Sequence, residues 1–309
     1  MPATAALTGA SGFVGGAVLQ ALLQDGWQVR ALARRPQSAA EPGAEFIQGS
    51  LADDDALERL CAGAEVLVHC AGQVRGRREA DFAAVNIEGT RRLLKAACEA
   101  SVPRLVGVSS LAAREPRLSY YAASKRDGET LMADARGIAE RYIVRPPAVY
   151  GPRDTELRPL LRLMARGIAP VPAPRGARFS LLHVEDLATA IARLATGNVG
   201  AAPGTVFELH DGQPGGYDWP ALTAAVARLR GGPVRTLHLP GALLRALAVG
   251  NVTAASVLGY APMLSPGKVR ELRFPDWVCN NDALGAACGW QPRITLDDGL
   301  PAILAADSR

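Results

Sequence analysis

A glycine-rich turn near the start of the chain constrains the fold more than any other feature. An apolar run at residues 3–8 leads into Thr8-Gly9-Ala10-Ser11-Gly12-Phe13-Val14-Gly15, and apolar residues at helical spacing follow. Gly9 permits a tight turn, Gly12 lets the backbone approach a pyrophosphate, and Gly15 lets the helix pack closely on a sheet. The sequence therefore predicts a strand, a phosphate-binding turn and a helix, in that order.

Strand-like and helix-like segments alternate through the first half of the chain. Strands are expected at 3–8, 27–33, 45–48, 65–71, 104–109 and 142–145, and the helices between them include 53–61 and 80–100. This alternation predicts an α/β fold, a Rossmann-type doubly wound parallel sheet with helices on both faces. In such a sheet the ligand lies at the carboxyl ends of the strands, where the glycine turn falls.

The end of the second expected strand bears on the choice of dinucleotide. A site for NAD presents a carboxylate there to the ribose hydroxyls of the adenosine. This chain has Ala33-Arg34-Arg35 and no acidic residue. Because guanidinium groups bind phosphate well, the pair favours NADP(H) over NAD(H). The alternative is that Arg34 and Arg35 form only a basic loop.

Tyr121 and Lys125 stand four residues apart in a segment expected to be helical. Residues i and i+4 share one face of a helix, and an ammonium beside a phenol lowers the pKa of the tyrosine from about 10. Such a tyrosine can act as an acid or a base near neutral pH. Lysine is rare, since Lys95, Lys125 and Lys268 are the only lysines among 34 basic residues. Alone, the pair also fits a surface helix that carries both residues by chance.

Further motifs follow one another in an order typical of one enzyme superfamily. They are Thr8-Gly9-x-x-Gly12-Phe13-x-Gly15, His69-Cys70-Ala71-Gly72, Phe82-x-x-Val85-Asn86-x-x-Gly89-Thr90, Ser109-Ser110, Tyr121-x-x-x-Lys125, Arg145-Pro146-Pro147-x-Val149-Tyr150-Gly151-Pro152 and His183-Val184-x-Asp186-Leu187-Ala188. Over nearly its whole length the chain resembles the extended branch of the short-chain dehydrogenase/reductase superfamily, which is similar to the NAD-dependent epimerases and dehydratases. In its motifs it most resembles the 3β-hydroxysteroid dehydrogenase and dihydroflavonol reductase groups.

The resemblance implies roles for individual residues. Tyr121 is expected to give or take a proton at the substrate oxygen, and Lys125 to bind the nicotinamide ribose and lower the pKa of Tyr121. Ser110, or else Ser109, is expected to hydrogen-bond the same oxygen. The expected cofactor contacts are Gly9, Ser11, Gly12, Phe13, Val14, Gly15, Arg34, Arg35, Ser50, Leu51, Cys70, Ala71, Gly72, Asn86, Ser109, Tyr121, Lys125, Pro146 and Val149. The expected substrate contacts are Pro147, Ala148 and Arg178.

The resemblance also implies a division into two domains. Residues 1–152 and about 178–212 are expected to form the NAD(P)-binding domain. Residues from about 153 to 177 and 213 to 309 are expected to form a smaller substrate-binding domain. His183 and Asp186 are expected to be structural, at a strand end and a helix cap that place the second domain.

Departures from the family pattern bear on the substrate. Sugar-nucleotide enzymes of this branch have asparagine in an Arg-x-x-Asn-Val-Tyr-Gly-Pro segment, where this chain has Ala148. With Arg34, this departure favours an NADP(H)-dependent oxidoreductase for an apolar ketone or secondary alcohol. One alternative is a nucleoside-diphosphate-sugar 4-epimerase or dehydratase with tightly bound NAD(P), whose substrate diphosphate would meet Arg153, Arg158, Arg162, Arg175 and Arg178. A third hypothesis is a structural or regulatory protein that binds NADPH without turnover, although such proteins tend to lose the tyrosine or the lysine.

Composition argues against other kinds of protein. The five cysteines form no CxxC pair, which favours free thiols in a reducing cytoplasm and argues against a metal site. The formal net charge is +4, but no dense basic block accompanies it, so nucleic-acid binding is not expected. The nearest cluster, Arg75-Gly-Arg77-Arg78, is expected to be a solvated helix start.

Neither a secretory signal nor a transmembrane segment is expected. The most apolar stretch, Leu239–Leu264, is interrupted by prolines and polar residues, so we expect it to cover an apolar pocket. The alternative is that this stretch touches a membrane surface. By the family resemblance, we expect a homodimer through a four-helix interface, with residues 80–100 and 120–140 of each copy as its helices.

Overall fold

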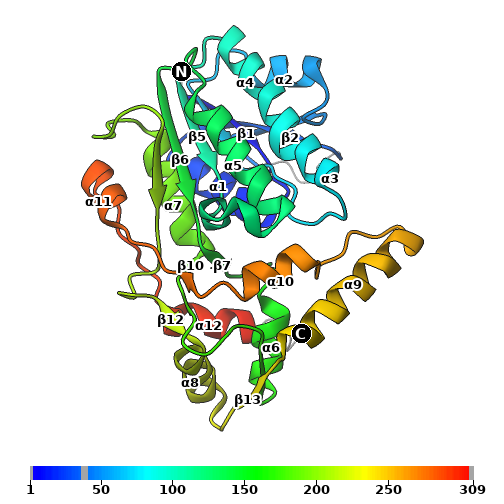
Figure 1. The fold of residues 1–309 in the computed structure, drawn as a ribbon. Helices are drawn as coiled ribbons and strands as arrows, with labels where there is room; N and C mark the ends of the chain where they lie inside the picture. Colours follow the sequence, from blue (N-terminus) through cyan, green and yellow to red (C-terminus); the bar gives the residue numbers. More distant parts are fainter. Residues whose placement is uncertain (1–2, 36–40, 306–309) are drawn as a thin grey trace.

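The computed structural model describes residues 3–35 and 41–305. Within these ranges, seven parallel strands form one sheet in the order β11-β6-β5-β4-β1-β2-β3 (Figure 1). The strands are β1 (Thr4–Thr8), β2 (Gln28–Ala33), β3 (Ala44–Gln48), β4 (Val66–His69), β5 (Arg104–Val108), β6 (Glu140–Arg145) and β11 (Thr205–Glu208). The chain runs outward from β1 to β3 and then returns to β4, so the sheet changes direction between β1 and β4. The predicted Rossmann-type sheet is confirmed.

Helices cover both faces of this sheet. On one face lie α1 (Phe13–Gln24) and α7 (Val184–Ala195), and on the other lie α2 (Asp54–Cys61), α4 (Thr90–Glu99) and α5 (Tyr120–Ala133). Alternate residues of each strand serve the two faces, so that Leu7 packs with the first layer and its neighbour Ala6 with the second. The hydrophobic core therefore consists of two layers separated by the sheet.

The two long helices expected at 80–100 and 120–140 differ from the prediction. The first consists of α3 (Glu79–Ala83), the π-helix η1 (Ala84–Gly89) and α4 in direct succession. The second ends at Ala133, because Ile138 is fully buried beneath the sheet and the chain must turn to bring it there. A π-turn inside a helix is often found at functional sites, and here it contains Asn86.

The remaining elements lie mostly below the sheet in the view of Figure 1, with α11 beside it. They are η2 (Leu111–Arg114), η3 (Pro116–Leu118), β7 (Ala148–Tyr150), α6 (Arg158–Ala165), β8 (Ile168–Val171), β9 (Arg178–Phe179), β10 (Leu181–His183), β12 (Tyr217–Asp218), α8 (Trp219–Arg230), β13 (Arg235–His238), α9 (Gly241–Leu258), α10 (Pro266–Leu272), β14 (Asp276–Trp277), α11 (Asp282–Cys288) and α12 (Leu296–Ala305). Helices α6, α8 and α12 share an apolar core of their own, built around Leu161, Val226 and Leu300.

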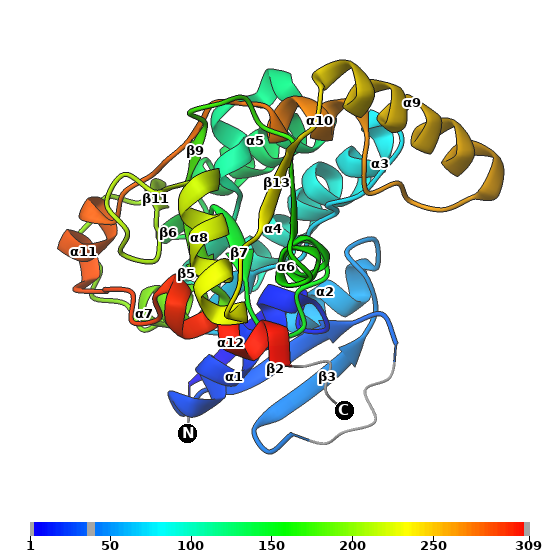
Figure 2. The same ribbon diagram turned by 90° about the horizontal axis from the view of Figure 1, so that it is seen from below.

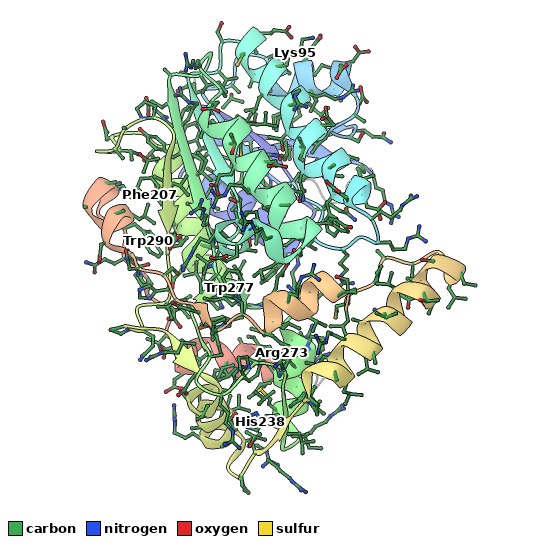
Figure 3. All side chains as sticks on the ribbon, in the orientation of Figure 1. Lys95, Phe207, His238, Arg273, Trp277 and Trp290 are labelled. Atoms are coloured by element: carbon green, nitrogen blue, oxygen red, sulfur yellow. The ribbon has the colours of Figure 1, made fainter. Side chains whose placement is uncertain are left out.

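The last part of the chain is tied back to the sheet. Phe207 of the edge strand β11 packs in the same core cluster as Leu284 of α11 and Trp290 (Figure 3). The indole of Trp290 donates a hydrogen bond to Thr189 of α7 at 3.1 Å. The carboxylate of Asp186 accepts hydrogen bonds from the backbone of Arg293 and Ile294, so its structural role is as expected.

Helix α9 projects from the body as an arm (Figures 1 and 2). It continues through Gly250 and Asn251, and the side-chain amide of Asn251 donates to the carbonyl of Leu264 at 2.9 Å. By length and composition it is the one helix within the described ranges that is long and apolar enough to cross a membrane. The expectation that this stretch covers a pocket is wrong, because large apolar residues such as Leu247 lie 52% exposed.

Candidate functional site

The glycine turn lies between β1 and α1, at the carboxyl edge of the sheet. Gly9 has a left-handed φ of +79°, and a Cβ on Gly15 would lie 2.1 Å from the carbonyl oxygen of Gly9. Helix α1 begins at Gly12 with no side-chain cap and no acidic residue in its first turn. Its first N–H groups are therefore directed at the space above the turn, as a bound pyrophosphate requires. The predicted residues from Gly9 to Gly15, including Ser11, Phe13 and Val14, form this turn and the first turn of the helix.

Arg153 adds a cation at the same place. Its guanidinium nitrogens lie 3.4 Å from the position that a Cβ on Gly16 would take, so the side chain rests on the first turn of α1. Its backbone adopts a left-handed φ of 71°, which is uncommon for a residue other than glycine. From the sequence, Arg153 is expected only as a contact for the substrate diphosphate of a sugar-nucleotide enzyme, because no local pattern distinguishes it from the neighbouring arginines.

The opposite end of the groove holds two arginines. A depression of about 690 Å³ is lined by Arg34 after β2, by Gln48, Gly49 and Ser50 after β3, and by Asp53 and Arg59 of α2 and its cap. Arg34 and Ser50 were expected here, whereas Arg59 was missed because it precedes no recognisable motif. The carboxylate of Asp53 accepts a hydrogen bond from the backbone of Ala56 and caps α2. Arg35 is exposed beside Arg34, and Leu51 packs on Gly89.

Ser110, Tyr121 and Lys125 come together at the end of β5. The hydroxyl of Ser110 accepts a hydrogen bond from the backbone N–H of Ala112 at 3.2 Å and lies near enough to the phenol of Tyr121 to lower the pKa of the tyrosine. The Nζ of Lys125 donates to the carbonyl of Val108 at 2.7 Å. The hydroxyl of Ser109, by contrast, donates to the buried carboxylate of Glu129 at 2.9 Å. Two neighbouring serines thus have different partners, one at the tyrosine and one in a buried ion pair.

The pKa of Tyr121 differs from the sequence-based expectation. Burial raises it above the usual value for tyrosine, and the nearby hydroxyl of Ser110 and the charge of Lys268 oppose that rise. Burial also lowers the pKa of Lys125 to about 8, against the opposing effects of Cys70 and Glu129.

Asn86 fixes the loop that follows β4. Its side-chain oxygen accepts from the backbone N–H of Gln73 at 2.7 Å, and its amide donates to the Gln73 carbonyl and to the hydroxyl of Ser124. A Cβ on Gly72 would lie 3.7 Å from the Nζ of Lys125, so this loop borders the lysine. Asn86 is only 3% exposed, and it therefore positions Gly72 beside Lys125 instead of offering a large surface of its own.

Beneath that loop, His69 links the ends of β1 and β4. Its Nδ1 lies 2.7 Å from the hydroxyl of Thr8, and its Nε2 lies 3.0 Å from that of Thr90. Burial and the charge of Lys125 lower the pKa of His69 to about 3, so its ring is neutral at physiological pH. Burial raises the pKa of the neighbouring Cys70 to about 12, which keeps it a thiol beside Ala71.

The residues expected to meet the substrate divide into two groups. The carbonyl of Pro146 accepts from the backbone of Leu111 at 2.9 Å, so the turn with Pro147 and Ala148 adjoins Ser110. Ala148 is exposed at the start of β7, and Val149 is half-buried beside it. Arg178 lies on β9 and donates to the carbonyl of Gly216 at 3.2 Å, so its guanidinium is directed at the protein backbone.

Most of the chain matches one known protein family. Residues 5–209 match the family described as the NAD dependent epimerase/dehydratase family. The chain belongs to this family. It is an NAD(P)-dependent oxidoreductase of the extended short-chain dehydrogenase/reductase type, as the motifs predicted. The glycine turn, the uncapped helix α1 and Arg153 fit the nicotinamide dinucleotide that this family binds.

Curated relatives include several enzymes of this family with reductase or dehydrogenase names. The chain is 40% identical over 279 residues to the ceramide reductase of Caulobacter vibrioides, covering 88% of this chain and 85% of that protein. It is 28% identical to the 4-hydroxy-2-methyl-3-oxo-4-farnesyl-3,4-dihydroquinoline-1-oxide ketoreductase of Stigmatella aurantiaca, covering 97% and 95% of the two chains.

Solved structures of the family share the fold at lower identity. The protein gox2253 superimposes with a TM-score of 0.75 at 24% identity, covering 99% of both chains. MoeE5 in complex with UDP-glucose and NAD superimposes with a TM-score of 0.71 at 19% identity, covering 99% of this chain and 98% of that one. These likenesses establish the fold of the family and not the reaction of this member.

Proposed function

We propose that this family member transfers hydride between NADP(H) and an apolar ketone or secondary alcohol, with Tyr121 as the acid and base. The observation that carries the proposal is that Ser110, at the end of β5, adjoins the phenol of Tyr121, with Lys125 four residues further along the same helix. The hydroxyl of Ser109 is engaged by Glu129, which supports Ser110 as the second group at the substrate oxygen.

In the direction of reduction, the bound dinucleotide supplies the hydride. Tyr121 donates its phenolic proton to the ketone oxygen, and Ser110 donates a hydrogen bond to that oxygen as it gains negative charge. The raised pKa of Tyr121 keeps the phenol protonated at neutral pH, which suits a proton donor. Lys125 holds the nicotinamide ribose, and the Val108 carbonyl keeps its ammonium in place.

The preference for NADP(H) rests on the two arginines at the adenosine end. Arg34 and Arg59 both line the depression there, and the Asp53 carboxylate in the same depression is engaged as the cap of α2. Two guanidinium groups suit a 2′-phosphate better than a ribose diol. Titration of the full chain with NADPH and NADH tests this choice, and tighter binding of NADH would contradict it.

The residues expected to contact the substrate support an apolar substrate. Ala148 has no polar side-chain atom, and Arg178 is directed at the Gly216 carbonyl, so neither supports a diphosphate contact. The relatives named ceramide reductase and farnesyl-dihydroquinoline-oxide ketoreductase indicate long apolar molecules. We propose a lipid ketone of the ceramide class as the first compound to assay.

The proposed division into two domains is supported by the separate apolar core of α6, α8 and α12. The homodimer through helices 80–100 and 120–140 and a cytoplasmic location also stay proposals. If the dimer exists, its second helix is the shorter α5, which ends at Ala133. Light scattering of the purified chain tests the dimer.

The decisive experiment replaces Tyr121 by phenylalanine. Tyr121→Phe should lower kcat/KM for an apolar ketone at least about 100-fold, since general acid catalysis contributes that much. NADPH binding should persist, because the phosphate-binding turn is untouched. The matched control is Tyr120→Phe, since Tyr120 is the preceding residue and is 53% exposed.

Three outcomes would overturn the proposal. Unchanged turnover in Tyr121→Phe would refute the role of the tyrosine. Turnover of UDP- or dTDP-sugars in preference to apolar ketones would instead favour the epimerase or dehydratase alternative. Binding of NADPH without turnover of any of these compounds would favour the regulatory alternative.

A further inference from the structure

The arm formed by α9 presents apolar side chains to solvent along one side. Leu243, Leu247, Val257 and Leu258 are exposed by 47%, 52%, 81% and 74%. Their spacing of four, ten and one residues places them on a single face of the helix, with Gly250 and Ala254 between them. A different face of the helix is buried, because Leu244 and Ala248 pack with Val269 of α10. The exposed stripe is thus a second face of the helix and not an unpacked core.

The stripe ends in an apolar tip that we define as Val257, Leu258, Tyr260 and Met263. Tyr260 and Met263 are 40% and 44% exposed on the turn that follows the helix. The Tyr260 hydroxyl donates to the side chain of Asn251 at 2.6 Å, which folds this turn back along the arm. In Figure 1 the chain runs back from the far end of α9 to α10, so both segments that flank the arm join the body.

The segment that contains the arm has cations and no acidic residue, and two of its cations pair with carboxylates outside it, Arg228 with Asp297 and Lys268 with Glu271. Residues 219–270 contain no aspartate or glutamate, whereas they contain Arg228, Arg230, Arg235, Arg245, Lys268 and Arg270. Arg235 and Arg245 are exposed, and neither forms an ion pair with any residue in the described ranges. An acid-free segment of this length suits a negatively charged surface.

A second group of cations lies beside the outer half of the arm. The guanidinium of Arg77 donates to the carbonyl of Ala255 at 3.1 Å, so the loop before α3 reaches the outer half of α9. Arg78 follows with its side chain 76% exposed and an ion pair of 3.8 Å to Asp81, while Arg75 pairs with Glu156. Val74, in the same loop, is 57% exposed. Apolar and cationic groups thus occur together at this end of the molecule.

We propose that α9, its apolar tip and the neighbouring loop of Arg77 and Arg78 dock the enzyme onto an anionic lipid bilayer. The aliphatic stripe enters the boundary between headgroups and acyl chains, and the arginines meet the lipid phosphates. The docking loop begins at Gly72, beside Lys125, so the reaction centre lies one loop away from the membrane surface. This inference goes beyond the proposed reaction and does not depend on it.

Vesicle flotation of the full chain tests the proposal. Vesicles of phosphatidylcholine with about 30 mol% phosphatidylglycerol should carry the protein, and pure phosphatidylcholine should carry it at least about tenfold less well. Val257→Ser with Leu258→Ser should lower the partition coefficient on the anionic vesicles at least about tenfold. Leu229→Ser on α8 is the matched control, because Leu229 is 42% exposed on a different helix.

Arg78→Gln tests the charged part, with Arg92→Gln as its control. Arg92 is 50% exposed on α4 and pairs with Asp54, as Arg78 pairs with Asp81. Arg78→Gln should weaken binding about fivefold, and Arg92→Gln should leave it within about twofold. The melting temperature of each variant checks that it folds.

Failure to float with anionic vesicles, or equal loss in Leu229→Ser, would overturn the proposal. So would conversion of a dimer to a monomer by the Val257 and Leu258 changes in lipid-free buffer, because the arm would then be a subunit interface. Tyr121→Phe should float like the unchanged protein. An inactive enzyme that floats would refute the proposed reaction alone, and an active enzyme that does not float would refute the docking alone.

Discussion

Helices α1 and α9 are both apolar, and their surroundings differ completely. Helix α1 lies between the sheet and α7 and buries Val18, Leu19 and Leu22. Helix α9 has 18 residues and buries only Leu244, Ala248 and Ala255, because α10 is its main neighbour. The apolar composition of a helix therefore does not decide whether it becomes core. The sheet covers one side of α1 and α7 covers another, whereas within the described residues the main neighbour of α9 is α10.

The largest contrast should come from leucine truncation in the two helices. Leu22→Ala removes a fully buried side chain and should lower the free energy of unfolding by about 2–5 kcal/mol. Leu247→Ala removes one that is 52% exposed and should change it by less than about 0.5 kcal/mol. Urea unfolding of both variants measures the difference. Similar losses would mean that α9 packs against the body in solution.

The next largest effect should be a loss of stability in acid, caused by the buried residue His69. The folded-state pKa of His69 is about 3, against a usual value near 6.5. Between these values the unfolded chain binds the proton and the folded chain does not, so His69 makes the stability fall as the pH falls from about 6.5 towards 3. The slope from this residue is at most about 1.4 kcal/mol per pH unit.

His69→Asn should flatten the loss of stability on acidification, as measured by melting temperatures between pH 7 and 5. His238→Asn on the exposed strand β13 is the surface control. An unchanged acid slope in His69→Asn would show that other groups cause the loss. Both variants need comparison at pH 7 first, because His69 also links Thr8 to Thr90.

The smallest effects should come from the same glycine substitution in the two helices. Gly15→Ala brings a Cβ to 2.1 Å from the Gly9 carbonyl and should weaken dinucleotide binding at least about tenfold. A Cβ on Gly250 meets no atom within 4 Å in the described structure, so Gly250→Ala should stabilise α9 by about 0.5–1 kcal/mol. NADPH titration and thermal unfolding of both variants test the pair. Loss of NADPH affinity in Gly250→Ala would contradict it.

Local patterns were sufficient for much of the sheet and of the reaction centre. The turn from Gly9 to Gly15 and the spacing of Tyr121 and Lys125 depend on residues near one another in sequence, which short motifs capture. The parallel sheet with helices on both faces followed from the alternation of strands and helices. The carboxyl ends of β1, β4 and β5 then bring the motifs to one edge.

Other features depend on contacts between distant segments. Arg59 and Arg153 reach the groove only because the fold places α2 and the end of β7 beside it. Burial in the fold raises the pKa of Tyr121, which the spacing of Tyr121 and Lys125 in the sequence does not reveal. The exposure of α9 depends on the absence of a covering element within the described ranges, which periodicity in the helix itself does not reveal.

One carboxylate joins the arm to the reaction centre. Glu271 is 5% exposed on α10, accepts a hydrogen bond from Ser119 and pairs with Lys268 at 3.1 Å. Ser119 in turn caps α5 through the backbone of Ala122, one residue beyond Tyr121. A displacement of the arm can thus be transmitted through Glu271 and Ser119 to the first turn of the helix that carries Tyr121. Substitutions in α10 can therefore affect both the position of the arm and the helix that carries Tyr121.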